Sequence, residues 1–179
     1  MKRGIWGYGK VVLACLMAGI TTVVFFGLGQ QVYEQTEREM EESADNIPED
    51  MRTLAAEKKY PFFVGSSYVT INRNYQGSDG VIGFSREDAL SFVKAYEYVK
   101  VDGKDQLREI ARERIGVYPF DSATQEERVD VTSTGKHTIR YWVEGESGLK
   151  AEMIMMVLVD ILPEGEEYRK SEVVYENGH

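Results

Sequence analysis

The chain has 179 residues, enough for one modest domain and an appendage but too few for two ordinary domains with separate cores. Hydrophobic residues make up 42% and charged residues 28%, which excludes a wholly disordered chain, a collagen-like fibre and a multi-span transporter. A formal net charge of -9 argues against broad nucleic-acid binding, so no nucleic acid is expected among the partners. One cysteine excludes an internal disulfide, and two histidines argue against a histidine-built metal site.

The N-terminal region contains an uncharged apolar stretch, VVLACLMAGITTVVFFGL at residues 11–28. As a helix that rises about 1.5 Å per residue, this stretch would span roughly 27 Å, which is enough to cross a bilayer. We therefore predict a cytoplasmic N-terminal segment at residues 1–10 and a transmembrane helix at 11–29. The rest of the chain is predicted to be exported across the membrane. Membrane lipid is the first partner that this arrangement implies.

The distribution of charge sets the orientation of the predicted span. Lys2, Arg3 and Lys10 precede it, and every acidic residue of the chain follows it. The excess of basic residues before the span keeps the N-terminus inside and places the remainder outside a cell membrane. Three alternatives stay open: a signal peptide cleaved near residues 27–29, lipidation of Cys15, and a pilin-like leader.

Small residues recur at every fourth position of the predicted span, at Ala14, Ala18 and Thr22. On a helix they share one face, where a second membrane helix can approach closely. We interpret them as a candidate contact with another protein of a membrane complex. The alternative is that small residues are simply common in spanning helices.

An acidic stalk is predicted at residues 30–58. Its segment 34–50 carries eight acidic residues against one base, Arg38, and has no sustained apolar stripe. A solvated spacer fits this pattern, with an acidic site for a basic partner as the alternative. An extracytoplasmic domain at residues 59–179 follows the stalk.

Two helices are predicted in that domain, at residues 86–99 and 104–115. Ser85 and Asp88 have the spacing of a capping box, and apolar residues follow at helical intervals. The dipeptide at residues 102–103, Asp-Gly, is interpreted as the break between the two helices.

The other elements expected in the domain are strands. Residues rich in β-branched and aromatic side chains predict strands at 60–64, 68–71, 137–144, 149–160 and 168–175. Within the fourth of these, residues 153–159 are continuously apolar, which predicts a strand covered on both faces. The predicted fold class is α+β: one N-terminal transmembrane helix, then a small antiparallel sheet with two helices packed on it.

Recognisable signatures of catalysis are absent from the sequence. It contains no Gly-rich phosphate loop, no paired-cysteine zinc spacing and no HExxH motif, and His137 has no evident catalytic partner. We therefore predict no catalytic, cofactor-binding or metal-binding residues and no enzymatic activity. A membrane-anchored hydrolase with an unrecognised acidic site remains an alternative.

Aromatic residues are more informative about binding. Tyr141, Trp142, Tyr168 and Tyr175 fall on predicted strands, where alternate side chains face outward. Tyrosine and tryptophan are enriched at contact surfaces, so these four are candidate partner-binding residues. If a helix covers their face, the same residues are ordinary core.

Residues 136–145, KHTIRYWVEG, are followed by Gly148 and by a strand that begins at Lys150. This stretch resembles the strand, glycine-containing turn and strand of the family that includes a mitochondrial inner-membrane translocase subunit and a cytochrome oxidase assembly factor. The resemblance implies one spanning helix, a small α+β domain that binds partner subunits, no catalytic centre, and the mitochondrial inner membrane as the alternative location.

Together these observations predict a single-pass membrane protein whose extracytoplasmic domain binds other proteins of a membrane complex and assists its assembly. A pilin-like or secretion-apparatus subunit is the alternative.

Overall fold

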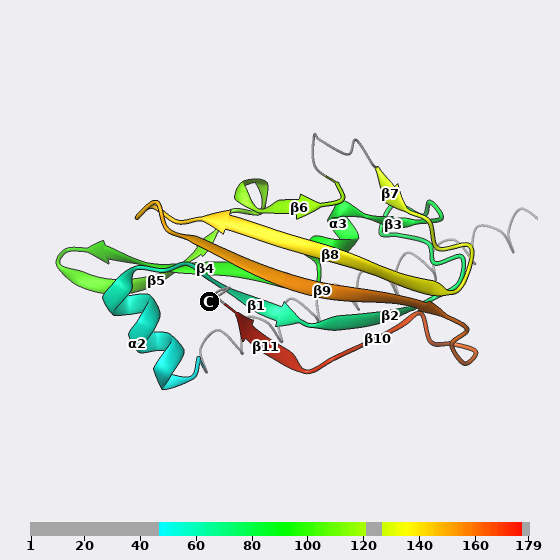
Figure 1. The fold of residues 1–179 in the computed structure, drawn as a ribbon, viewed down its shortest axis with the longest axis horizontal. Helices are drawn as coiled ribbons and strands as arrows, with labels where there is room; N and C mark the ends of the chain where they lie inside the picture. The colour runs from blue at the N-terminus through cyan, green and yellow to red at the C-terminus, as the bar shows by residue number, and fades with distance from the viewer. Residues whose placement is uncertain (1–46, 121–126, 177–179) are drawn as a thin grey trace, which may run out of the picture. The chain divides into compact units, whose positions relative to one another are not determined.

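In the computed structural model, the residues described are 47–120 and 127–176. Most of them belong to β-strands, which form two main sheets (Figure 1). Sheet A contains, in spatial order, β11 (Val173–Glu176), β1 (Phe62–Ser66), β4 (Val93–Val101) and β5 (Lys104–Ile110). Sheet B contains β10 (Tyr168–Lys170), β2 (Tyr68–Asn72), β9 (Lys150–Asp160), β8 (Gly135–Glu144) and β6 (Gly116–Tyr118).

The chain passes directly between the two sheets at two places. Ser67 alone separates β1 of sheet A from β2 of sheet B, and residues 171–172 separate β10 of sheet B from β11 of sheet A. The two crossings are joined, because the backbone N–H of Ser67 donates to Oγ of Ser171 at 2.9 Å. The single strand predicted at 168–175 is therefore two short strands that belong to different sheets.

Shorter elements complete the described chain: α2 (Glu49–Lys58), β3 (Phe84–Ser85), α3 (Arg86–Leu90), η1 (Arg112–Arg114) and β7 (Arg128–Val129). β3 and β7 pair with each other as a separate two-stranded sheet. The capping box predicted at the start of α3 is confirmed, since Ser85 and Asp88 each accept the backbone N–H of the other.

The main hydrophobic core lies between the facing sides of the two sheets. Phe63 of sheet A and Tyr141 of sheet B meet there, with ring centroids 6.2 Å apart. A second cluster lies on the opposite side of sheet A, where Phe62 and Tyr96 pack with Ile47 and with Ala55 of α2. Sheet A is therefore covered on both faces along β1 and the first half of β4.

The two predicted helices at 86–99 and 104–115 are wrong beyond the first turn of α3. Residues 93–101 and 104–110 are instead the strands of a hairpin. Asp102 and Gly103 form its turn, with φ of 51° and 77°, and Asp-Gly is the preferred pair where both central residues of a hairpin turn have positive φ. The first five residues of β4 are all buried, so this half of the strand is covered on both faces.

The predicted fold class is corrected accordingly. The described residues form a two-sheet, mainly β structure in place of an α+β sheet with two packed helices. The longest described helix, α2, has 10 residues, and no described helix is long and apolar enough to cross a membrane. The span predicted at residues 11–29, with Ala14, Ala18 and Thr22, lies outside the described residues.

The structure also bears on the predicted stalk at 30–58. Residues 49–58 form α2, and both Ile47 and Ala55 are buried against sheet A. The part of the predicted stalk from residue 47 onward therefore packs on the folded domain.

Candidate functional site

Sheet B has one face in the core and one face open among the described residues. Along β9, burial alternates strictly, so Met153, Met155 and Val157 point into the core while Ile154 and Met156 point away from it. The expectation that residues 153–159 are covered on both faces is therefore wrong. We call the side that points away from the core the outer face; its central members are Tyr68, Tyr118, Thr138, Arg140, Trp142, Glu152, Ile154 and Met156.

Apolar side chains are unusually exposed on the outer face. Ile154 is 56% exposed, Tyr68 45%, Tyr118 40% and Met156 39%. The register places them side by side: Met156 pairs with Tyr68 on one neighbouring strand, and Ile154 lies opposite Arg140, which in turn lies opposite Tyr118. They form a band across four strands of sheet B that is apolar on β2, β9 and β6 and is crossed by Arg140 on β8; we call it the apolar band.

Arg140 and Trp142 complete the band on β8. The guanidinium of Arg140 lies over the ring of Tyr118, 5.7 Å from its centroid. The half-buried indole of Trp142 lies against Gly116, where a side chain would collide with the ring. Both side chains are therefore held in place by residues of β6.

The four sequence-predicted aromatic residues occupy four different environments. Trp142 lies on the outer face. Tyr141 is fully buried and its hydroxyl donates to the carbonyl oxygen of Ala89 at 2.9 Å. Tyr168 is half-buried and makes an edge contact with Phe92, and Tyr175 packs beside the second core cluster under α2. Only Trp142 among them belongs to an open surface.

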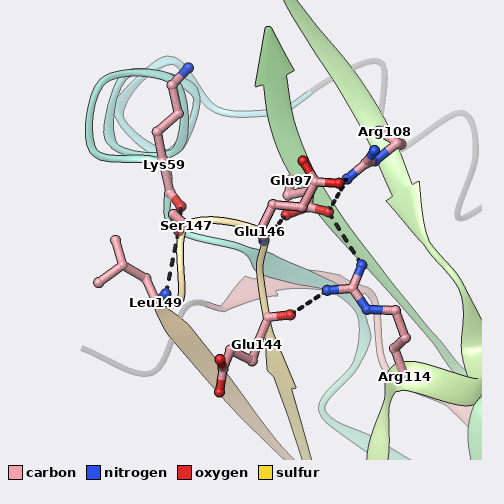
Figure 2. Close-up of polar contacts among 8 residues, drawn as sticks. All are labelled: Lys59, Glu97, Arg108, Arg114, Glu144, Glu146, Ser147 and Leu149. Atoms are coloured by element: carbon pink, nitrogen blue, oxygen red, sulfur yellow. Dashed lines mark hydrogen bonds and ion pairs between the residues drawn. The ribbon is translucent and has the colours of Figure 1, made fainter.

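A second notable feature is a polar cluster where the turn between β8 and β9 meets sheet A (Figure 2). Its centre is Glu97 of β4, whose side chain is only 5% exposed. One carboxylate oxygen of Glu97 accepts from Nη2 of Arg108 at 2.7 Å, and the other accepts the backbone N–H of Glu146 at 2.8 Å. Arg114 approaches the first oxygen at 3.7 Å and donates to the carbonyl oxygen of Glu144 at 2.7 Å.

This Glu97 cluster is balanced in charge. Arg108 also pairs with the carboxylate of Glu146 at 2.6 Å, so two arginines face two glutamates. The hydrogen bonds from Arg108 to Glu97 and Glu146 raise the pKa of its guanidinium. Because each charged group is already engaged, the arrangement ties the β8–β9 turn to sheet A and offers no free acid or base.

The described residues contain no group of three or more potential metal ligands. His137 is half-buried at the start of β8, and it is the smallest of the causes that lower the pKa of Asp130. The main cause of that shift is the hydrogen bond that the backbone N–H of Thr132 donates to Asp130. This carboxylate therefore stabilises its own local turn.

Sequence reasoning missed Tyr68, Tyr118, Arg140, Ile154 and Met156 as members of a surface. Alternation along β8 could have pointed to Arg140, because it shares a face with Trp142. For Ile154 and Met156 the sequence carries no such signal, since apolar residues occupy both faces of β9.

Comparisons of this chain with protein-family models, with curated proteins and with solved structures found no match.

Proposed function

We propose that this chain is a protein-binding module, held at a membrane by its apolar stretch at residues 11–28, which engages another protein of a membrane assembly through the outer face of sheet B. The observation that carries this proposal is the apolar band in which Tyr68, Ile154 and Met156 lie side by side and exposed. The proposal assigns the chain no catalytic centre.

The composition of the outer face supports a protein partner. Monomeric soluble proteins rarely expose contiguous apolar patches larger than a few hundred Å², and large patches rimmed by polar residues mark interaction sites. Tryptophan, tyrosine and arginine dominate the residues that contribute most to binding at such sites. Trp142, Tyr118 and Arg140 provide these three types within the band, and contacts with β6 restrict their motion before binding.

The membrane location rests on the sequence alone. An uncharged stretch of this length with basic residues before it favours insertion with the N-terminus inside. The exported part is acidic, so anionic headgroups repel it and leave its surfaces available to proteins.

A photo-crosslinking experiment tests this function. The full chain is expressed in its native membranes with p-benzoylphenylalanine at position 154, and adducts are identified by mass spectrometry. We expect a discrete protein adduct that Met156→Asp abolishes, because a charge in the band would be buried on binding. Ile161 is the matched control position, since it is also an exposed isoleucine but follows the end of β9.

The same adducts from positions 154 and 161, or adducts with lipid alone from position 154, would contradict the proposal. Far-UV circular dichroism of Met156→Asp must match that of the parent, so that a lost adduct reports on the surface and not on folding.

A further inference from the structure

We infer that the protein that covers the outer face is a second copy of this chain, packed about a two-fold axis that places Arg140 of each copy against Glu152 of the other. This inference rests on the proposed docking role of the outer face and names the partner. It follows from the arrangement of four residues on β8 and β9.

Arg140, Trp142, Glu152 and Ile154 form a quadrilateral on the outer face. The register pairs Arg140 with Ile154 and Trp142 with Glu152. Arg140 and Glu152 therefore occupy one diagonal, and Trp142 and Ile154 occupy the other. One diagonal is formed by two opposite charges and the other by two large apolar side chains.

The charged diagonal is not an ion pair within the chain. Diagonal neighbours on antiparallel strands are about 7–8 Å apart, within reach of long side chains. The Arg140 guanidinium nevertheless lies over Tyr118 on the far side of β8, and neither Arg140 nor Glu152 forms an ion pair with any residue in 47–120 or 127–176. Both side chains are exposed to water.

Covering the apolar band removes that water from both charges. A charge that is buried without a partner is costly, so whatever packs on Ile154 must bring an acid to Arg140 and a base to Glu152. A partner that places a base at Arg140 or an acid at Glu152 is excluded. The partner's surface must therefore carry one acidic and one basic side chain, with an apolar contact between them.

A second copy meets this requirement by symmetry. In a two-fold interface, if residue i contacts residue j, then j of the first copy also contacts i of the second. An axis along the Trp142–Ile154 diagonal exchanges the positions of Arg140 and Glu152. It therefore stacks Ile154 on Ile154 and forms the Arg140–Glu152 pair twice. The outer face is self-complementary about this axis.

Cysteine crosslinking in membranes tests the inference. The full chain carrying Cys15→Ser and Ile154→Cys is oxidised with copper phenanthroline, and the disulfide-linked dimer is quantified on a non-reducing gel. We expect a dimer from position 154 and little from Ile161→Cys in the same background. Adding either Arg140→Glu or Glu152→Arg should lower the dimer yield by about fivefold or more, because each variant sets like charges against each other twice.

Co-expression of the two charge variants with different tags provides the decisive comparison. A copy with Arg140→Glu and a copy with Glu152→Arg restore both opposite-charge pairs, so the mixed dimer should recover to at least half the parental yield. Protease resistance of each variant in detergent should match the parent, which separates lost pairing from lost folding.

The outcomes separate this inference from the proposed function. Absence of the dimer, or a dimer yield that neither charge variant changes, overturns the inference. If position 154 then captures a different protein in the photo-crosslinking experiment, the docking role of the outer face stands while the second copy is excluded. If position 154 captures no protein in either experiment, both proposals fail.

Discussion

Gly116 and Trp142 lie directly opposite each other on β6 and β8, and the absence of a side chain at Gly116 provides the space for the indole. A Cβ atom on Gly116 would lie 2.0 Å from Cε2 of Trp142 and 2.4 Å from its Nε1. Because the outer face is open, the ring can move outward but cannot keep its contact with β6. The position of this aromatic side chain is therefore set by a glycine on another strand.

Gly116→Ala should displace Trp142 and lower the free energy of unfolding by about 1–3 kcal/mol, the usual cost of an overpacked contact. In a Trp6→Phe background, the fluorescence of Trp142 should shift to longer wavelength as the ring becomes more exposed. Gly135→Ala is the matched control, because it lies on β8 and its Cβ would meet no atom within 4 Å. Equal stability and equal emission in the two variants would contradict the packing described here.

The elements that sequence reasoning identified well are those whose pattern is local. Ile139, Tyr141 and Val143 alternate with polar residues along β8, and the structure buries these three. Helices are predicted in place of the β4–β5 hairpin because Val93, Tyr96 and Val99 have helical spacing. On the strand, Val93 and Tyr96 are both buried but on opposite faces, since they belong to different hydrophobic clusters. The Asp-Gly turn was the signal that could have decided between helices and a hairpin, because two positive φ angles suit a hairpin.

The candidate surface was only partly predictable, for a different reason. Trp142 could be identified from its own strand, but Tyr68 and Tyr118 reach the same face from strands that are distant in sequence. Ile154 and Met156 have the composition of core residues, and only the packing of β9 shows that they point away from the core. Sheet order and the location of the core are tertiary properties that the local pattern does not contain.

Removing the charge of Glu97 should destabilise the domain. Glu97→Gln keeps the shape of the side chain but replaces one acceptor with a donor that faces Arg108, in a site that is almost fully buried. We expect a loss of about 1–3 kcal/mol in the free energy of unfolding, measured by urea denaturation. Glu144→Gln is the control, because the Glu144–Lys150 pair is exposed on both sides and should contribute at most about 1 kcal/mol.

A loss for Glu97→Gln no greater than that for Glu144→Gln would mean that the Glu97 cluster does not hold the β8–β9 turn against sheet A. Hydrogen exchange of the Glu146 backbone amide tests independently whether Glu97 holds this turn. That amide donates to Glu97 and should exchange faster in the Glu97 variant.

Tyr141 should make stability depend on alkaline pH. Burial raises the pKa of the Tyr141 hydroxyl well above its ordinary value, so the folded protein holds it neutral. Its contribution is fully present below the unfolded pKa of about 10 and is lost as pH rises toward the folded pKa. Tyr141→Phe should cost about 1 kcal/mol at neutral pH, through the lost hydrogen bond to Ala89, and should weaken the decline above about pH 10.

The measurement for Tyr141 is urea unfolding at neutral pH and at about pH 10.5. Tyr118→Phe serves as the comparison, because Tyr118 is an exposed tyrosine on the same sheet. If the two variants show the same dependence on alkaline pH, the buried hydroxyl does not control it.

Asp79 should make stability depend on acidic pH in the opposite direction. The backbone N–H of Val81 donates to Oδ1 of Asp79 at 3.0 Å, and Arg128 forms an ion pair with the other oxygen. The hydrogen bond from Val81 first, and Arg128 second, lower the pKa of this carboxyl, although slight burial opposes them. A lowered folded pKa stabilises the fold at pH values above the unfolded pKa, and that contribution is lost as pH falls through the folded pKa.

Asp79→Asn should therefore reduce the loss of stability between about pH 4 and pH 2.5, as measured by urea unfolding at several pH values. Equal slopes for Asp79→Asn and the parent over this range would exclude Asp79 as a source of acid sensitivity and would leave its contacts with Val81 and Arg128 energetically neutral.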